Sequence, residues 1–465
     1  MFVPNGTHVT KAKVVRLEQI RLLGKRGKNK MRKMKDSGIE WIGEIPEDWE
    51  VGRVKNCYIH HKYVVGDNAD NYERLALTLN GVIKRSKVDA TGLQPEAFEG
   101  YQILRQNELV FKLIDLENVS TSRVGYSPFT GIVSPAYIVL NPRNEKESRF
   151  GEYFFLSMWQ REVFNHLGDD GVRSSLNAKD LLDIPYPLVS SDEKQKIVTF
   201  LDCKCSEIDS VISKTKSSIE EYQKLKQSII TETVTGKVKI ENGKVCGKYD
   251  TYKDSGIEWI GEIPGEWSVI RTKFISDSMS KGNGITKEQI VQNGDSPCVR
   301  YGEIYSKYNH SFSNCITKTN KSMYTNLQYF SYGDILFACT GELPEEIGKN
   351  IVYLGNEDCL AGGDIIVMKH SQNPSFLNYV YNSYGQTQKS LGKTKLKVVH
   401  ISATEIANIF VALPSLPVQQ QIADFLDKKC SEIDKLITKK EQLVVELEAY
   451  KKSLIYEVVT GKREV

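Results

Sequence analysis

The chain has 465 residues, of which 40% are hydrophobic and 26% are charged, so it is too long for one ordinary core and we predict two or more globular domains. No apolar run reaches the roughly 18 residues of a membrane span, and the N-terminus lacks the apolar core of a secretory signal. The nine cysteines are odd in number and scattered, which predicts reduced thiols in the cytoplasm and neither a disulfide framework nor a metal site.

Residues 1–34 form a basic extension with ten Lys or Arg and one acid. Their net charge is +9, so the total of +3 leaves 3 − 9 = −6 for the rest of the chain. Any nucleic-acid contact must therefore come from local basic faces. We interpret the extension as upstream sequence with the true start at Met31 or Met34; the alternative is a disordered phosphate-binding tail.

The rest of the chain is a tandem duplication. Thirteen of the fifteen residues in 35–49 return in 253–267 at an offset of 218, while 201–209 and 234–237 return in 426–434 and 459–462 at an offset of 225. We predict a first globular domain at 35–189, a first long helix at 190–236, a linker at 237–252, a second globular domain at 253–415 and a second long helix at 416–465.

The segments between the repeats, about 50–189 and 268–415, diverge but keep a faint common frame. Residues 107–111 (NELVF) align with 333–337 (GDILF), and 181–188 (LLDIPYPL) align with 406–413 (IANIFVAL). The expected fold class is α+β, with two globular domains of one mixed α/β fold that carry different surfaces.

Two helical segments follow these domains, and each has an apolar stripe with heptad spacing. The stripe needs a partner, and duplication makes the other helix the simplest one, in an antiparallel coiled coil with pseudo-twofold symmetry that separates the domains. The expected pairing residues are Leu201, Ile208, Ile212, Ile219, Tyr222, Ile229, Leu426, Ile433, Ile437, Val444, Leu447 and Leu454. In this register Ile212 meets Leu447 and Tyr222 meets Ile437, and Lys226 and Lys451 lie at the seam's edge. A stripe alone is also typical of simple packing or dimerisation.

The seam from Leu201 to Thr233 measures roughly 50 Å at about 1.5 Å per residue. Because DNA rises about 3.4 Å per base pair, domains at its two ends would lie roughly 15 base pairs apart at most. The helices therefore predict a ruler between two half-sites.

Taken together, these features resemble the specificity subunits of type I restriction-modification enzymes. The resemblance covers about 35–463 and is carried by 38–46 (GIEWIGEIP), 108–116 (ELVFKLIDL), 333–337, 400–403 (HISA) and the Glu/Gln-rich helix starts at 192–197 and 417–422. It implies that each divergent domain is a target recognition domain that reads a few base pairs of a bipartite DNA site.

The resemblance also implies partners. The long helices would hold two modification subunits, which bind S-adenosylmethionine and methylate adenine. Restriction subunits, which use ATP and Mg²⁺, would translocate and cut DNA. The chain itself would bind no cofactor and perform none of this chemistry.

Residues that read bases lie in the divergent segments, so their chemistry must identify them. Arg173, Ser174 and Ser175 offer a guanine-reading fork and two hydroxyls in a glycine-flanked loop. Lys393, Lys395 and Lys397 alternate along an extended segment at the corresponding place of the second half and suit phosphates. Weaker candidates are Lys84, Arg85, Lys87, Lys112, Arg123, Lys281 and Asn283. For the lysines, a solvated charged face is the alternative.

Two other classes of function compete. A methyltransferase or nuclease is disfavoured because 373–376 (NPSF) lacks the second proline of the amino-methyltransferase motif, and 341–349 has the wrong spacing for a phosphate-binding loop. A coiled-coil adaptor that binds only proteins would explain the helices but not two diverged copies of one globular fold. We therefore predict a non-catalytic DNA-binding subunit.

Overall fold

The computed structural model describes residues 32–88, 97–114, 116, 122–167, 175–393 and 398–465. The chain forms two compact units: unit 1 is Met1–Ser213 with Val445–Val465, and unit 2 is Lys214–Val444. Within the described residues, no helix combines the length and apolar character that crossing a membrane requires.

Unit 1 contains a domain with two four-stranded sheets. The first has the strand order β6–β5–β10–β7 and the second β4–β11–β8–β9. Only β10 and β5 pair in parallel; the other neighbours are antiparallel. The strands are β4 (Tyr58–His60), β5 (Arg74–Thr78), β6 (Gly81–Arg85), β7 (Gln102–Leu104), β8 (Leu109–Phe111), β9 (Val124–Tyr126), β10 (Gly131–Val133) and β11 (Ile138–Pro142).

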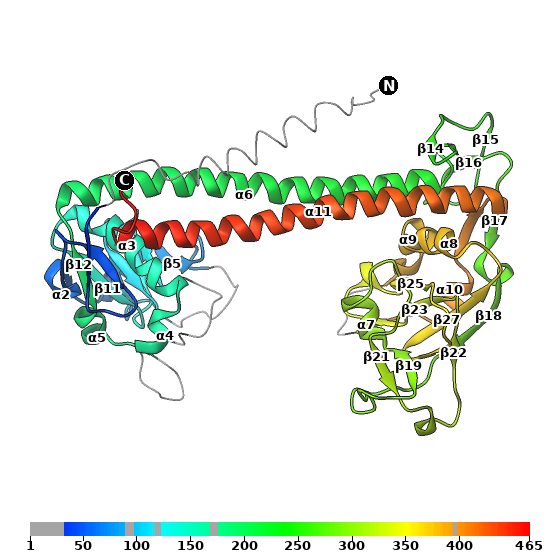
Figure 1. Ribbon diagram of the computed structural model, residues 1–465, viewed down its shortest axis with the longest axis horizontal. Coiled ribbons are helices and arrows are strands. Elements are labelled where there is room, and N and C mark those ends of the chain that lie inside the picture. The colour runs from blue at the N-terminus through cyan, green and yellow to red at the C-terminus, as the bar shows by residue number, and fades with distance from the viewer. Residues whose placement is uncertain (1–31, 89–96, 115, 117–121, 168–174, 394–397) are drawn as a thin grey trace. The chain divides into compact units, whose positions relative to one another are not determined.

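Unit 2 repeats this topology, which confirms that the two domains share one mixed α/β fold (Figure 1). Its sheets have the orders β21–β19–β26–β22 and β18–β27–β23–β25–β20, again with a parallel pair at the corresponding place, β19 with β26. The fifth strand, β20, has no counterpart among the described strands of unit 1. The strands are β18 (Ser276–Lys281), β19 (Ser296–Val299), β20 (Ser311–Phe312), β21 (Thr317–Thr319), β22 (Tyr329–Phe330), β23 (Ile335–Ala338), β25 (Asn350–Tyr353), β26 (Cys359–Ala361) and β27 (Ile365–His370).

The central strands β8 and β23 are buried on both faces. Along β23, Ile335 and Phe337 pack in a cluster with the helices, while Leu336 and Ala338 pack in a cluster with the other sheet. This alternation follows from the two-residue period of a strand. Each strand follows a residue with positive φ, Asn107 at 70° or Gly333 at 89°, so the two aligned segments share this backbone feature.

Helices cover the outer face of the second sheet in each domain. In unit 1, α3 (Glu145–Gln160) packs against β8, β9 and β11, and its rings form an aromatic cluster with Tyr58 and Tyr186. In unit 2 the same place is taken by α8 (Pro374–Tyr381) and α9 (Tyr384–Ser390). Shorter helices are α2 (Val54–Cys57), α4 (Val163–Leu167), α5 (Ala178–Asp183), α7 (Tyr301–Ser306) and α10 (Ala403–Ala407), with 3-10 turns η1 (Gly66–Asn71), η2 (Thr272–Phe274), η3 (Lys321–Met323) and η4 (Pro344–Glu346).

Two-stranded ribbons complete both units. The strands that enter and leave each domain pair antiparallel, β3 (Glu50–Arg53) with β12 (Pro185–Leu188) and β17 (Ser268–Arg271) with β29 (Phe410–Leu413). The other pairs are β1 (Met34–Asp36) with β2 (Glu44–Pro46), β13 (Ile240–Glu241) with β14 (Lys244–Val245), β15 (Tyr252–Asp254) with β16 (Glu262–Pro264), and β24 (Thr340–Gly341) with β28 (Val399–His400).

The two long helices, α6 (Ser191–Val234) and α11 (Leu416–Val459), pair antiparallel within each unit. In unit 1, Lys451 donates to Asp209 at 2.6 Å, and in unit 2, Lys226 donates to Asp434 at 2.7 Å. Asp434 and Lys451 are the repeat equivalents of Asp209 and Lys226 at the offset of 225, so each helix donates the same lysine to the same aspartate of the other. In both pairs the residue numbers sum to 660, within one residue of the predicted register.

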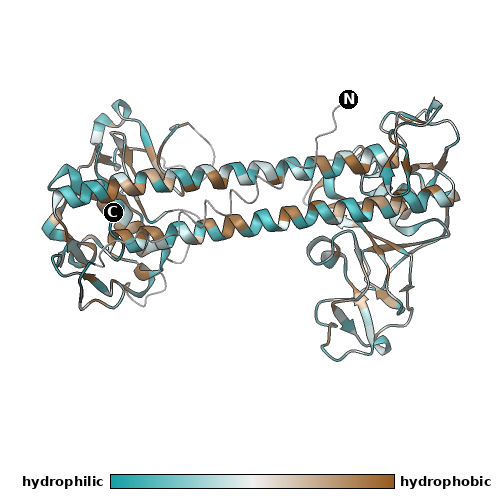
Figure 2. Ribbon diagram, turned by 45° about the horizontal axis from the view of Figure 1, so that its top comes forward, coloured by the Kyte–Doolittle hydropathy of each residue, from teal (hydrophilic) through white to brown (hydrophobic). Residues whose placement is uncertain are grey.

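Burial along the helices follows the heptad pattern. Nine of the twelve expected pairing residues are buried, and Ile219, Tyr222 and Ile229 are half-buried. Apolar and polar turns alternate along α6 and α11 in Figure 2, as expected for helices with one apolar stripe. Lys226 and Lys451 keep 28% and 27% of their side chains exposed, so they lie at the edge of the stripe as predicted.

The repeated tryptophan segments (35–49 and 253–267) dock on the ends of the long helices. Trp49 and Trp267 are buried and contact the ends of α11 and α6, where Gly461 and Gly236 adopt φ values of 70° and 72°. Tyr456 donates to Ile42 O at 3.0 Å in unit 1. The repeat is therefore explained by packing at each helix end.

Candidate nucleic-acid interface

In each domain, the chain beyond the central strand pairs with the segment that leads into the last short helix. The partners are Ile114 and Ser175 in unit 1, and Thr340 and His400 in unit 2. These pairs occupy equivalent positions, and the helices that follow begin with equivalent capping boxes at Asn177 and Ser402. The two strand ends are therefore the same site in two copies, and we call each a strand-end site.

The strand-end site of unit 1 brings together Lys112, Arg123 and Ser175. Lys112 is half-buried just past β8, and Ser175 is exposed opposite Ile114. The Arg123 guanidinium lies within 3.5 Å of Lys112 O and 3.4 Å of Ile114 O. Hydroxyl and ammonium donors thus share one edge, which suits phosphate and base-edge acceptors.

The basic strand β6 lies next to β9 at this side of the domain. Lys84 is exposed with its ammonium 5.4 Å over the Phe129 ring, whereas Arg85 is half-buried. Lys87 donates to Ala69 O at 2.7 Å and lies 3.7 Å from Asp70. Lys84 is therefore the most accessible cation of this strand.

The strand-end site of unit 2 contains Lys281 and Lys393. Lys281 is 67% exposed and lies 3.5 Å from Asp364. Lys393 donates to His400 O at 2.8 Å and forms an ion pair with Glu405. Partial burial acts to raise the pKa of Glu405, but the hydrogen bonds from Lys393 and Ser402 outweigh it, so this pKa is lowered. Lys393 is thus tied to the protein, and Lys281 is the freer cation.

Two of the predicted DNA-contacting residues are buried. Arg123 is fully buried, and Asn283 is only 9% exposed and accepts from Gln328 N at 2.6 Å. Arg123 contacts the backbone just beyond β8, and Asn283 binds the backbone of the loop before β22, so both side chains make internal contacts. Arg173, Ser174, Lys395 and Lys397 lie outside the described residues, so their predicted roles stay predictions.

Sequence reasoning missed Lys62 in unit 1. The register pairs His60 with Leu140 and Phe111 with Ile138, so its continuation places Lys62 opposite Ile138. In unit 2, Lys281 pairs with Ile366, which itself faces Phe337. Lys62 and Lys281 are therefore equivalent, and both are exposed. The strand register was needed to find this match, because the two segments share no recognisable sequence.

The described residues hold no group of three or more His, Cys, Asp or Glu side chains that suits a metal ion. The strand-end sites instead offer ammonium, hydroxyl and imidazole groups on two copies of one scaffold. Such groups bind phosphates and base edges. Fold and side-chain chemistry together define a duplicated protein whose two domains carry related but different surfaces.

Comparisons with known proteins identify the family. The model of the type I restriction modification DNA specificity domain matches residues 264–446. Two specificity subunits of Methanocaldococcus jannaschii are similar over nearly their whole lengths. The putative type I restriction enzyme MjaX subunit is 26% identical over 91% of this chain and 96% of the relative, and the MjaVIII subunit is 25% identical over 90% and 94%.

A solved chain from work on complex assembly and conformational transition of the type I restriction-modification system shares the fold. Its TM-score is 0.67 at 14% identity, with 90% of this chain and 99% of that chain covered. Residues 264–446 thus carry a type I restriction modification DNA specificity domain, and nearly the whole chain is similar to type I specificity subunits, the non-catalytic DNA specificity components of these systems.

Proposed function

We propose that the chain reads a bipartite double-stranded DNA site, with one half-site for each domain. The observation that supports this most is the pair of strand-end sites, which keep one backbone arrangement but carry different side chains. Ser175 and Lys112 stand in unit 1 where His400 and Ala338 stand in unit 2. Two unlike readers on one scaffold suit two unlike half-sites.

The partner subunits supply the chemistry in this proposal. Two modification subunits bind along the long helices and use S-adenosylmethionine to methylate adenine. Restriction subunits use ATP and Mg²⁺ to translocate and cleave. The likeness to a chain from a type I assembly supports a multi-subunit complex, and the helices leave charged outer faces for partners beside their buried stripe.

The gap between the half-sites is proposed to depend on the length of the paired helices. Removal of one heptad from each helix shortens the pair by roughly 10 Å at about 1.5 Å per residue. At about 3.4 Å per base pair, the gap should shorten by about three base pairs. An unchanged gap in the selected sites would contradict this ruler.

Selection from random duplexes tests the function directly. The full chain with its modification subunit is incubated with a random DNA pool, and the bound fraction is sequenced. A motif of two half-sites with a fixed gap is expected, and exchange of residues 50–189 for those of a different specificity subunit should alter only one half. An absence of enrichment would instead support the coiled-coil adaptor.

Arg173 offers the sharpest single-residue test within this function. Arg173→Ala should weaken discrimination at one half-site by about 1–3 kcal/mol, because a guanidinium fork reads guanine with two hydrogen bonds. Subunit assembly should stay intact. Quantitative binding to single-base variants of the selected site would measure the change, and an unaltered preference at both half-sites would exclude Arg173 as a base reader.

A further inference from the structure

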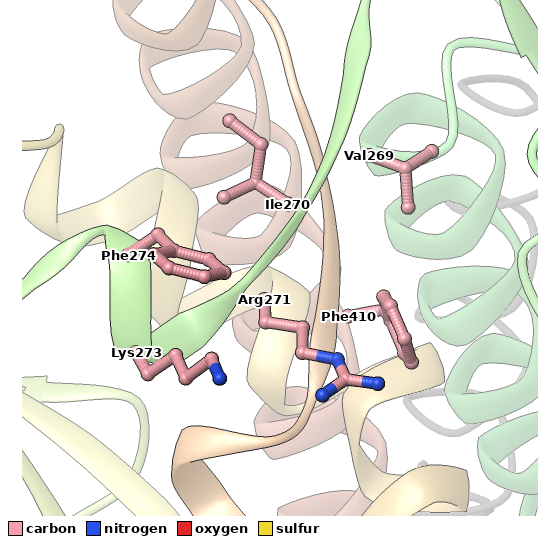
Figure 3. A pocket seen from close by; sticks show the side chains of 6 residues that line it. All are labelled: Val269, Ile270, Arg271, Lys273, Phe274 and Phe410. Carbon is pink, nitrogen blue, oxygen red and sulfur yellow. The ribbon is translucent and has the colours of Figure 1, made fainter.

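A shallow pocket of about 500 Å³ lies on the ribbon formed by β17 and β29 in unit 2. Figure 3 shows its lining: the side chains of Arg271 and Lys273 end on the same side of the ribbon, between the rings of Phe274 and Phe410. Val269 and Ile270 complete it. We call these six residues the cationic pocket. It is separate from the strand-end site.

In the same ribbon of unit 1, both cations bind one residue, Asp183. Lys55, equivalent to Lys273, lies 2.6 Å from Asp183, whose pKa is lowered by that hydrogen bond. Arg53, equivalent to Arg271, donates to Asp183 O. In unit 2 the position of Asp183 is taken by the uncharged Asn408, and neither Arg271 nor Lys273 forms an ion pair within the described residues. Unit 2 therefore keeps both cations but lacks the carboxylate that faces them in unit 1.

Apolar side chains accompany this loss. Phe274 stands where unit 1 has Asn56, and 72% of it is exposed. Ile270 replaces Gly52, and Phe410 replaces Pro185 opposite the arginine in the ribbon register. Arg271 lies 5.0 Å over the Phe410 ring, and Lys273 lies 4.8 Å over the Phe274 ring. Aromatic side chains and Arg are enriched at protein–protein interfaces, so the exposed Phe274 ring beside Arg271 suits a protein-binding surface.

We propose that the cationic pocket binds an acidic segment of a modification subunit, with an aromatic or aliphatic side chain against Phe274 and Phe410. The carboxylates replace the counter-charge that Asp183 supplies in unit 1, because charge complementarity fixes the register of such contacts. A nucleic-acid backbone would satisfy the cations but would leave the apolar lining without a partner. The lining therefore favours a protein occupant.

This inference rests on the proposed function and adds an asymmetry to it. The pocket exists in unit 2, whereas the equivalent ribbon of unit 1 is closed by its own ion pair. Two identical modification subunits would thus bind through unequal contacts. The subunit held at the second half gains the extra contact.

Site-specific cross-linking tests the occupant. A photoreactive p-benzoylphenylalanine replaces Phe274 in the full chain, and a matched chain carries it in place of Asn56. Each is assembled with the modification subunit and the selected DNA, irradiated, and analysed by mass spectrometry. We expect position 274 to cross-link to an acidic segment of the modification subunit and position 56 to give little product. Cross-links from 274 to DNA or to a basic segment, equal yields from both positions, or none would overturn the proposal.

A nearly isosteric substitution tests the charge argument without disturbing the fold. Asn408→Asp restores the unit 1 arrangement and should occupy the cations internally, which weakens binding of the second modification subunit about two- to fivefold. The charge reversal Arg271→Glu with Lys273→Glu should weaken it about tenfold or more. Binding is titrated by native mass spectrometry, where the one-subunit complex should accumulate.

The matched control is Asp183→Asn, which frees the cations of unit 1 and should leave the affinity unchanged or slightly higher. DNA selection by every variant should return the wild-type motif. Unaltered subunit binding by Asn408→Asp and by the charge reversal would refute the pocket while leaving the DNA-reading function intact. Failure of the wild-type chain to select a bipartite motif would refute the proposed function instead.

Discussion

The two recognition domains join the long helices through one shared contact and one that differs. Tyr153 donates to Asp202 at 2.6 Å in unit 1, and Tyr379 donates to the equivalent Asp427 at 2.9 Å in unit 2. A few residues earlier on α6, Lys194 forms a buried ion pair with Glu147. At the equivalent place, Gln419 is buried and donates to Pro414 O at 2.8 Å.

The difference shows which features of the contact between domain and long helix the fold requires. A buried ion pair and a neutral amide network fill the same space, so neither charge is needed to place the domain on its helix. What both units keep is a buried polar group with a hydrogen-bond partner, because an unpaired buried group is costly. The domains could therefore diverge in their chemistry while their geometry stayed fixed.

The largest expected difference between the two units comes from removing the buried Lys194 ammonium of unit 1. Lys194→Ala leaves Glu147 buried without its partner and should cost about 3–5 kcal/mol of unfolding free energy. Gln419→Ala in unit 2 should cost about 1–3 kcal/mol, since only neutral hydrogen bonds are lost. Urea denaturation with hydrogen exchange read separately in each domain would measure both. Equal losses of unfolding free energy would contradict the distinction between the buried ion pair of unit 1 and the neutral contacts of unit 2.

The glycines that end the long helices should instead respond alike. Gly236→Ala and Gly461→Ala place a Cβ against Pro264 and Pro46 at φ values of 72° and 70°. Each should destabilise its own unit by about 1–3 kcal/mol. Thermal unfolding of the two variants, with Gly243→Ala as a control at positive φ but in open space, would isolate the packing contribution. A large difference between the two would show that the helix ends are not equivalent.

Much of this fold follows from the sequence because it is repeated. Asp202 and Asp427 lie inside the repeated helical segment, so their common role was predictable, and Asn107 and Gly333 marked the central strands. The counterparts Lys194 and Gln419, by contrast, share no chemistry, and only the structure shows that they fill one position. For the strand-end sites, Arg123 was chosen for its charge, but a side chain's burial depends on contacts distant in sequence. Lys62 was missed because its equivalence to Lys281 depends on strand register, which the two diverged segments do not reveal.

Acid should destabilise unit 2 through the protonation of His310. His310 stacks on Tyr379 with ring centroids 3.8 Å apart, and removal from water, aided by Lys226, lowers its pKa to about 3. The unfolded chain takes up a proton near the ordinary value of 6.5 while the folded chain does not, so stability falls as the pH falls from about 6.5 towards 3. The loss should be about 1 kcal/mol between pH 6.5 and 5.5.

Hydrogen exchange at several pH values would detect this loss in unit 2. His310→Asn removes the titrating group and should flatten the pH dependence, although it lowers stability at neutral pH. Unit 1 within the same molecule is the control. If the variant kept the full slope, the pH sensitivity would have to come from carboxylates, and His310 would be excluded as its source.

The smallest expected effect concerns the reciprocal ion pairs between the long helices. Asp209→Asn and Asp434→Asn each remove a partner that is about half exposed, 55% and 54%, and each should cost only about 0.2–1 kcal/mol. The costs should be equal, because the repeat places both pairs in one register, and both should shrink as salt screens the charges. Denaturant midpoints at about 0.05 and 0.5 M salt would test this, with Asp192→Asn, which removes a 3.6 Å ion pair with Lys146 away from the contact between the helices, as the comparison. If either substitution cost several kcal/mol, charge pairing would hold the helices together. Values below about 1 kcal/mol would assign that role to the buried stripe, on which the pairing of α6 with α11 depends.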